Sequence, residues 1–233
     1  MPGAIRSLSQ GSGISSSQAG TGTLPATISA GDTVVILIAN DDDDTLSLDD
    51  FFDITIIGDE NGGQTNVNLA AFKAAGTEDG STFNFTVAGL NDEQFSYVCF
   101  SLSGLADPDV TAPEGTATAF TGGGSTNFDP PSETHGAGDV GTYYALACFG
   151  ADNNAVTTVS TYPSGYVSTG TENPADSGGV FLGWAFKRVS SNVENPGTFV
   201  IGSAEQGAAI TAMFLEIASG SGVLTGPLGG PFV

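Results

Sequence analysis

The feature that most restricts the fold of this chain is a succession of short segments with the pattern of β-strands. Residues 33–39 form an apolar run typical of a strand buried on both faces. Residues 81–87 alternate strictly and place Phe83 and Phe85 on one face. Gly, Asn, Asp and Pro separate the segments, as in turns. Further predicted strands are 96–104, 142–150, 179–189, 197–202 and 208–218, with 54–57 and 154–160 as shorter candidates. The pattern predicts an all-β protein.

The sequence also contains an internal repeat, whose matched segments lie far apart in the chain. Gly31-Asp32 and the apolar strand that follows are similar to Gly138-Asp139 and the strand that follows it, and Phe72-Lys73 aligns with Phe186-Lys187. Other matched segments keep the same order, which argues against chance. These are 56–63 with 168–179, 81–87 with 197–202, and 97–104 with 212–220. Residues 68–76 have helical propensity, but this comparison favours a strand. Such a period is far longer than a solenoid or propeller repeat.

The repeat predicts two half-units, about 32–104 and 139–217, that share one core, with 105–137 crossing between them. Two antiparallel sheets made of two Greek keys describe a jelly roll. We therefore predict a two-sheet antiparallel β-sandwich of jelly-roll type with pseudo-duplicated halves. Strands 33–39 and 142–149 should occupy equivalent places, as should 97–102 and 212–217. The residues predicted to point inward are Val34, Ile36, Phe85, Phe100, Leu146, Phe181, Leu215 and Ile217.

The two ends of the chain differ in composition from the centre. Both are rich in Gly, Ser, Thr and Pro, and such segments bury too little apolar surface to fold alone. We therefore expect an extended N-terminal arm over 1–31, a single jelly-roll sandwich over 32–218 and a C-terminal tail over 219–233.

The charge excludes several kinds of partner. The chain has 26 acidic and 4 basic residues, a formal net charge of −22. Nucleic-acid binding needs clustered Lys and Arg, and so does binding to an anionic membrane surface, so neither partner is expected. The N-terminus lacks the apolar segment of a signal peptide, and no apolar run is long enough to span a membrane. We expect the chain to be made and folded in a cytoplasm.

No motif predicts catalysis. Residues 136–141 match GxGxxG, but a strand follows them where a dinucleotide site needs a helix. His135, the single histidine, is expected in an exposed loop. Cys99 and Cys148 lie in apolar stretches and are expected as buried thiols, with a disulfide as the alternative. Trp184 has apolar neighbours at alternate positions and is interpreted as a core residue. We predict no catalytic residue and no bound organic cofactor.

One acidic segment is a candidate for metal binding. Asp41, Asp43, Asp44 and Asp49 lie close together, and Ca²⁺ prefers clustered oxygen ligands. Their spacing is not that of an EF-hand, so a solvated acidic loop is the main interpretation and a calcium site the alternative.

Several of these features together resemble a known group of proteins. They are the Ser/Gly/Thr-rich start, Gly31-Asp32 with its apolar strand, the Phe72-Lys73 strand ending at Gly76, the strands 83–87 and 97–104, the long crossover, and the closing strands 181–189 and 214–217. This pattern resembles jelly-roll modules of tailed-bacteriophage structural proteins, which include capsid decoration (cement) proteins and tail and fibre components. The family's arginines are depleted in this chain, which suggests a high-salt setting.

The resemblance implies a non-enzymatic virion protein. A capsid decoration protein that stabilises the shell is the main expectation, with the major capsid or tail proteins of the same virion, and further copies of itself as a homotrimer, as partners. The alternative is a tail-fibre or adhesin-type module that binds a receptor or glycan. Such a module should expose loop aromatics, for which Tyr162 and Tyr166 are the candidates.

Overall fold

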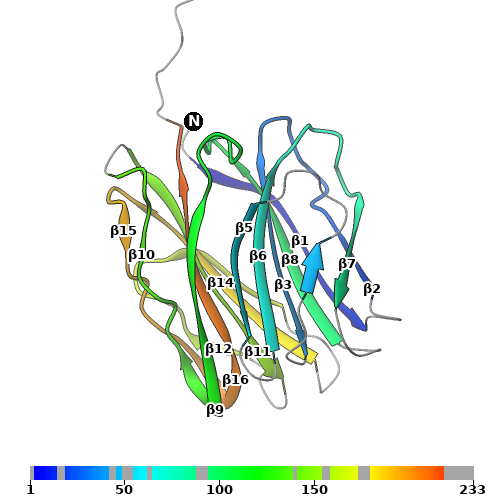
Figure 1. Ribbon diagram of the computed structural model, residues 1–233, viewed down its shortest axis with the longest axis vertical. Coiled ribbons are helices and arrows are strands. Elements are labelled where there is room, and N and C mark those ends of the chain that lie inside the picture. The colour runs from blue at the N-terminus through cyan, green and yellow to red at the C-terminus, as the bar shows by residue number, and fades with distance from the viewer. Residues whose placement is uncertain are drawn as a thin grey trace, which may run out of the picture.

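The structure is a computed structural model that describes residues 3–14, 19–41, 46–48, 55–61, 65–87, 94–138, 141–153, 158–172 and 179–217. Over these residues the chain forms antiparallel β-strands and no helix (Figure 1). The prediction of an all-β antiparallel sandwich is therefore confirmed. Short apolar or alternating segments form strands because successive side chains point to opposite faces, which lets each strand pack on one or both sides.

The first half of the chain contains eight strands. They are β1 (Ala4–Ile14), β2 (Ala19–Thr23), β3 (Thr33–Asp41), β4 (Leu46–Leu48), β5 (Thr55–Asn61), β6 (Thr65–Lys73), β7 (Thr82–Val87) and β8 (Gln94–Ser103). Five of them form the first sheet, in the order β1-β8-β3-β6-β5. The other three form a small outer sheet, in the order β2-β7-β4.

The second half repeats this order with eight more strands. They are β9 (Glu114–Phe128), β10 (Glu133–Thr134), β11 (Tyr143–Asn153), β12 (Val159–Thr161), β13 (Val167–Glu172), β14 (Gly179–Val189), β15 (Val193–Glu194) and β16 (Phe199–Leu215). The second sheet has six strands. Five of them follow the order β9-β16-β11-β14-β13, which is the first order with each number raised by eight, and β12 also pairs with β16. In addition, β10 and β15 form a separate two-stranded sheet.

The equivalence extends to the longest strand. Residues 199–201 of β16 pair with β12 on one side and with the end of β9 on the other, as β7 pairs with β4 and β2. Residues 207–215 then pair with β11, as β8 pairs with β3. The predicted strands 197–202 and 208–218 are thus one continuous strand. The predicted equivalence of 33–39 with 142–149 agrees with this arrangement, because β3 and β11 lie at the centre of their sheets.

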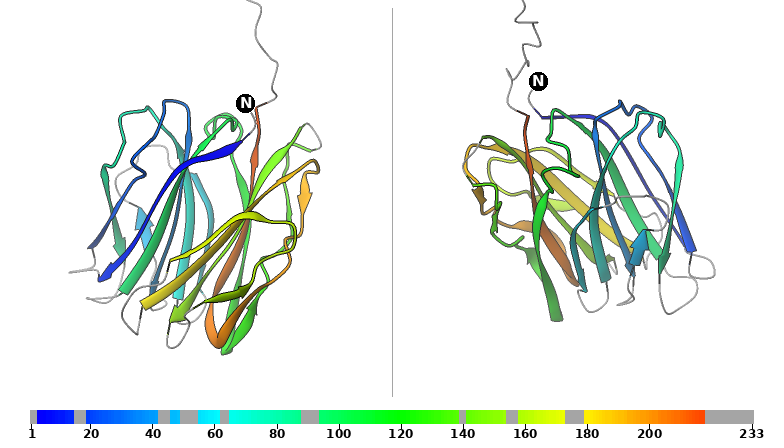
Figure 2. Two further views of the ribbon diagram at one scale, coloured as in Figure 1. Left: turned by 180° about the vertical axis from the view of Figure 1, so that it is seen from behind. Right: turned by 45° about the horizontal axis from the view of Figure 1, so that its top comes forward.

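The two large sheets stack face to face and share one core (Figures 1 and 2). Contacts join β8 to β14, β6 to β16 and β5 to β9, so the strand order runs in opposite directions in the two sheets. Large side chains from both halves meet there, including Leu37, Phe100, Trp184, Phe186 and Phe214. Burying one such side chain contributes about 1.5–3 kcal/mol. The shared core therefore joins the halves into one body.

Each large sheet also carries a second apolar layer on its outer face. In the first half this layer lies under β2, β7 and β4 and contains Phe83, Phe85, Phe95 and Tyr97. In the second half it lies under β12 and the end of β9 and contains Phe128, Phe149, Phe181 and Phe199. The molecule thus has outer layers that the two-sheet prediction did not include.

The N-terminal segment corrects the expected domain boundaries. Residues 4–14 pair with β8 and residues 19–23 pair with β7, so this part of 1–31 belongs to the sheets and is not a free arm. The physical reason is that glycines in these strands make room for aromatic rings of the neighbouring strands. A Cβ at Gly22 would lie 2.2 Å from Cζ of Phe83, and one at Gly20 would lie 2.1 Å from Cζ of Phe85. The residues from 218 onward lie outside the described part.

The crossover and some inward residues are also corrected. Residues 105–137 contain β9, a 15-residue strand of the second sheet, together with β10. Leu215 is only partly buried and Ile217 is 50% exposed, because the last strand ends at Leu215. The other predicted inward residues, Val34, Ile36, Phe85, Phe100, Leu146 and Phe181, are fully buried.

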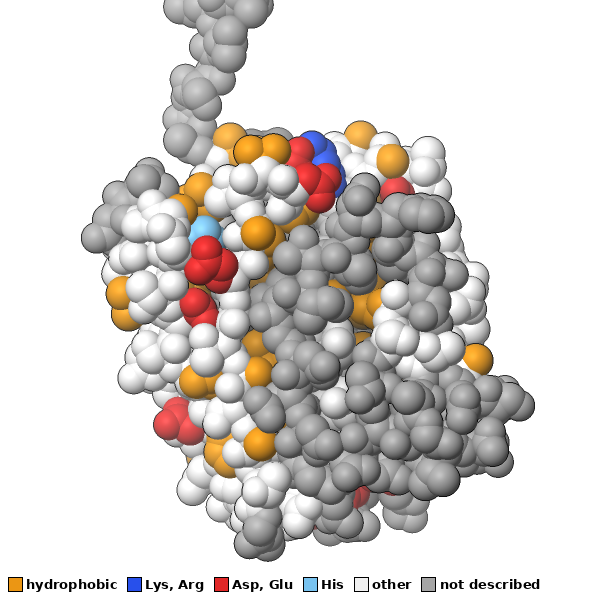
Figure 3. All heavy atoms as spheres, viewed as in Figure 1, with side chains coloured by type: hydrophobic (Ala, Val, Ile, Leu, Met, Phe, Trp, Pro, Cys, Tyr) orange, Lys and Arg blue, Asp and Glu red, His pale blue; other side chains and the backbone are white. Residues whose placement is uncertain are grey.

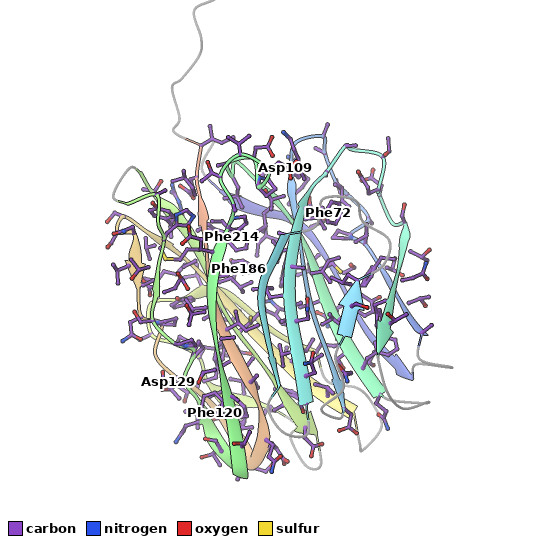
Figure 4. All side chains as sticks on the ribbon, viewed as in Figure 1. Phe72, Asp109, Phe120, Asp129, Phe186 and Phe214 are labelled. Atoms are coloured by element: carbon purple, nitrogen blue, oxygen red, sulfur yellow. The ribbon has the colours of Figure 1, made fainter. Side chains whose placement is uncertain are left out.

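The sequence alignment of Phe72 with Phe186 differs by one residue from the equivalence that the structure shows. Phe186 lies in the shared core, whereas Phe72 lies in the outer layer of the first half (Figure 4). Because side chains alternate between faces, a shift of one residue moves a side chain to the other side of its sheet. On β6 it is Ala71 that faces the shared core.

Candidate functional site

All four basic residues of the chain form ion pairs with acidic residues of the same chain. The pairs are Arg6–Asp32, Lys73–Asp107, Lys187–Glu194 and Arg188–Glu216. On the face drawn in Figure 3, the blue patch of Lys or Arg at the upper end lies against acidic side chains. No Lys or Arg is left without an acidic partner, so binding to an anionic ligand would compete with an internal pair.

Three of these pairs include a buried carboxylate, that of Asp32, Glu194 or Glu216. Asp32 accepts hydrogen bonds from Arg6 Nε at 2.6 Å, from Ser101 Oγ at 2.7 Å and from the Ser29 amide at 3.0 Å. Burial by itself raises the pKa of Asp32, but these hydrogen bonds and the charge of Arg6 outweigh it, so the pKa lies below its usual value. These hydrogen bonds connect β1 and β8 to the start of β3.

Glu216 has the same role at the junction of the two halves. It accepts hydrogen bonds from Arg188 Nε at 2.7 Å, from Thr142 Oγ1 at 2.7 Å and from the Gly3 amide at 3.0 Å. Burial raises the pKa of Glu216, but the hydrogen bonds from Arg188 and Thr142 lower it more, so the carboxyl stays ionised at neutral pH. One carboxylate thus joins the start of the chain to the end of β16.

Among the described residues, a group of titratable side chains lies on the outer face of the second half. We call it the β10–β15 cluster, and it consists of Glu114, Thr116, Glu133, His135, Tyr166, Lys187 and Glu194. Glu133 and Glu194 lie directly opposite each other in the β10–β15 pair, and each is only 6% exposed. Like charges in such a position destabilise a ladder unless each has its own donors.

Each glutamate of this cluster has such donors. Glu133 accepts from Thr116 Oγ1 at 2.5 Å and from the Thr134 amide at 2.9 Å. Glu194 accepts from Lys187 Nζ at 3.0 Å and from the Tyr166 hydroxyl at 3.3 Å. Burial and the neighbouring Glu194 charge raise the pKa of Tyr166, which stays a neutral donor. The carboxylates are thus occupied by structural hydrogen bonds, which is the arrangement of a structural polar core.

His135 is buried, which corrects its expected place in an exposed loop. Only 1% of its surface is exposed, because its ring packs against Tyr143 at 5.0 Å between centroids. Its Nδ1 accepts a hydrogen bond from the Ala137 amide at 3.2 Å. This places the proton of the neutral ring on Nε2, which has no hydrogen-bond partner among the described residues. No Ser or Cys hydroxyl or thiol is shown bonded to this ring, so the described contacts do not form a nucleophile–base pair.

The other candidate residues from the sequence have different outcomes. Cys99 and Cys148 are free, fully buried thiols in different layers, as expected. Burial raises the pKa of both thiols. Trp184 lies in the shared core in edge contact with Phe100 at 5.6 Å, as expected. Tyr166 is buried, so it does not offer an open ring face to a sugar.

The predicted calcium ligands are mostly outside the described residues. Asp43, Asp44 and Asp49 lie outside them, and Asp41 is the last residue of β3. Within the described part of the chain, no three His, Cys, Asp or Glu residues are grouped so as to hold a metal ion. Calcium binding therefore stays a prediction. No described helix is long and apolar enough to cross a membrane.

The remaining candidate surfaces are the edges of the two large sheets. An edge strand exposes unpaired backbone N–H and C=O groups, and natural proteins protect it with charges, prolines or bulges. Three edges have such protection. Arg6 and a bulge interrupt β1, Asp59, Glu60 and a bulge occur in β5, and Glu172 and a bulge occur in β13.

The edge strand β9 begins at the charged Glu114, and its pairing with β16 shifts register beyond Phe120. Residues 115–128 contain no charged residue and no proline. From Glu114 to Phe120 the pairing with β16 has no register shift. The sequence interpretation missed this strand because its Gly, Thr and Ala residues are typical of a loop, although the alternation Thr116-Ala-Thr118-Ala-Phe120 was a usable signal.

No family model, curated protein or solved structure matches the chain in comparisons with known proteins.

Proposed function

We propose that the chain is a non-enzymatic structural protein of a virus particle, a capsid decoration protein that stabilises the shell. In this proposal each half is a jelly-roll unit. The observation that carries the proposal is the internal pairing of every basic residue, together with carboxylate clusters that are satisfied by their own donors. Such an interior favours a rigid scaffold over a reactive site.

The surface chemistry supports the same proposal. With a net charge of −22 and its four cations in ion pairs, the chain has a strongly hydrated surface whose self-repulsion is screened by salt. Contact with a shell then relies on uncharged segments. Since 4–14 and 19–23 are built into the sheets, the clamping segment of the proposal is the uncharged stretch 219–233. Many copies on one particle multiply a weak contact. The proposed partners are the major capsid or tail proteins of the same virion.

The test is a truncation after residue 218 in the virus that encodes the chain. It removes no charged side chain and none of the described strands, so folding and electrostatics should be kept. We expect the truncated protein to have the same melting temperature as the full chain, to be missing from purified particles, and to leave them less tolerant of heat. Full occupancy on particles would contradict the clamp.

A second measurement on the same particles separates the two kinds of virion protein. Particles that lack the chain should adsorb to host cells normally if it decorates the shell. If they stay intact on heating but no longer adsorb, the receptor-binding alternative replaces the decoration protein. Imaging particles with an antibody against the chain then locates it on the shell or on the tail.

A further inference from the structure

One buried carboxylate lies far from every basic side chain of the protein. Asp152 is only 4% exposed and lies near the last residue of β11, at the lower end of the large sheets in Figure 1. The four basic residues lie near the other end: Lys187 and Arg188 pair in register with Ala145 and Tyr144, Lys73 pairs with Thr33, and Arg6 binds Asp32. The strand from Ala145 to Asp152 spans about 23 Å. Since a buried charge is costly unless it is balanced, Asp152 either takes up a proton or is balanced by a cation from solution.

The direction of the Asp152 side chain follows from its strand. Leu146 and Cys148 of β11 face the shared core, and because side chains alternate, Asp152 faces the same way. The opposite sheet is close at this level. A Cβ at Gly150 would lie 2.7 Å from Cγ2 of Val67 and 3.0 Å from Cβ of Ala39.

Two residues further down each strand, the side chains that face each other are polar. On the first sheet these are Asp41 at the end of β3 and Thr65 at the start of β6, which pair with each other in register. On the second sheet the corresponding residue is Asp152. The lower end of the shared core thus changes from apolar to polar side chains.

Two hydroxyl groups of the first sheet are directed into this lower end. Thr65 shares the face of Val67, and Ser96 shares the face of Val98, and both valines belong to the shared core. Thr65 and Ser96 are 0% exposed, and their hydroxyl oxygens have no hydrogen-bond partner among the described residues. Buried hydroxyls are normally hydrogen-bonded, so two unpartnered ones beside a buried carboxylate point to a bound group.

The chemistry of these groups fits a hard cation. Ca²⁺ takes about 6–8 oxygen ligands in a flexible arrangement and keeps some water, whereas Mg²⁺ requires a near-ideal octahedron. The carboxylates of Asp41 and Asp152 supply the negative charge, and the hydroxyls of Thr65 and Ser96 supply neutral oxygens. Asp41 is partly exposed, which gives the site access to solvent. With two carboxylates, the group is smaller than the clusters of three acidic, His or Cys residues that the described chain lacks.

We propose that the lower end of the shared core binds one Ca²⁺ ion through Asp41, Thr65, Ser96 and Asp152. The ion balances the charge of Asp152 and connects the second half of the chain to the first. This site shares only Asp41 with the acidic segment that the sequence suggested. The inference does not rest on the virion function, since it concerns the purified chain alone.

The experiment combines titration calorimetry with thermal unfolding of the full chain after treatment with a chelator. A buffer with about 0.15 M NaCl screens weak binding to the acidic surface. We expect one Ca²⁺ per chain and a rise in melting temperature of at least about 3 °C at saturating Ca²⁺. The same concentration of Mg²⁺ should have a smaller effect. No response to Ca²⁺, or a response that NaCl of equal ionic strength reproduces, would overturn the proposal.

Asp152→Asn tests the carboxylate. It should weaken Ca²⁺ binding at least about a hundredfold, and the metal-free variant should melt no lower than the unmodified protein, because a buried charge is removed. Asp109→Asn is the control, since it changes the net charge equally at an exposed position and should bind Ca²⁺ normally. Equal weakening in both variants would overturn the site. So would loss of binding in Glu205→Gln, another buried acid, with binding kept in Asp152→Asn.

Thr65→Val tests the hydroxyl and has a closely matched control. Thr211 is also 0% exposed with an unpartnered hydroxyl, but it lies on the second sheet between Ala209 and Met213, which face outward from the shared core. Both substitutions remove one buried hydroxyl, so their effects on folding are comparable. Thr65→Val should weaken Ca²⁺ binding about tenfold, and Thr211→Val should leave it unchanged. The same affinity in the two variants would contradict a site at this end of the core.

Discussion

Two outer regions of the molecule are held together by different chemistry. In the first half, β2 and β7 cover a cluster of aromatic rings, in which the ring centroids of Phe83 and Tyr97 lie 5.4 Å apart and those of Phe85 and Phe95 lie 4.8 Å apart. In the second half, the β10–β15 pair carries Glu133 and Glu194, and Lys187 donates to Glu194. The first region is thus fixed by apolar area and the second by satisfied charge.

This difference shows how two parts of one fold should respond to substitution. Apolar burial stabilises in proportion to the area removed from water. A buried ion pair adds little net stability but is costly to break, since removal of one partner leaves a buried charge alone. The aromatic layer should therefore respond to changes of volume, and the charged layer to changes of partner.

The largest effect is expected from the aromatic layer. Phe83→Ala removes a fully buried ring that packs against Tyr97 and over Gly22, and should reduce the free energy of unfolding by about 3–5 kcal/mol. Denaturant unfolding measures it. Leu215→Ala is the control, because Leu215 is only partly buried and should cost clearly less. A loss below that of the control would mean that the first outer layer does not depend on its rings.

The charged layer should show its dependence in a double-mutant cycle. Lys187→Met leaves Glu194 with the Tyr166 hydroxyl as its remaining side-chain donor and should cost about 1.5–3 kcal/mol. Adding Glu194→Gln should recover part of this loss, because the uncompensated buried charge is then removed. Additive losses in thermal or denaturant unfolding would show that the two groups do not interact.

Glycines provide a sharper test of why the N-terminal strands belong to the sheets. Gly22→Ala would place a Cβ 2.2 Å from the Phe83 ring and should cost about 1–3 kcal/mol through strain. Gly202→Ala is the matched control in β16, since nothing lies within 4 Å of its Cβ. It should be neutral within about 0.5 kcal/mol. Similar melting temperatures for the two variants would contradict the role of glycine in docking β2.

The smallest effect concerns pH. The pKa of Asp32 is lowered in the folded state, so its pairing stabilises the protein above the unfolded value of about 4 and is lost as the pH falls through the folded pKa. Arg6→Met should reduce stability by about 1 kcal/mol at pH 7 and by less at pH 2, because a falling pH favours the protonated form of Asp32. Unfolding curves at both values check this. An equal loss at the two pH values would assign the effect to packing of the Arg6 side chain.

The sequence by itself determined the class of fold and the internal repeat. Runs such as 33–39 and alternating segments such as 81–87 form strands because the period of two belongs to local backbone geometry. Burial of Cys99, Cys148 and Trp184 also followed from their apolar neighbours. The charge count of the chain already predicted that anionic partners are disfavoured.

Only the tertiary structure decided which face of a buried strand meets which layer. A strand buried on both faces is apolar throughout, so its sequence cannot tell that Phe72 lies in an outer layer while Phe186 lies in the shared core. The same holds for β1, β2 and β9, whose Gly, Ser, Thr and Ala residues provide little apolar surface of their own. Their place depends on rings and backbone groups supplied by distant strands. The partners of the buried carboxylates likewise come from residues far away in the sequence, as Gly3 and Glu216 show.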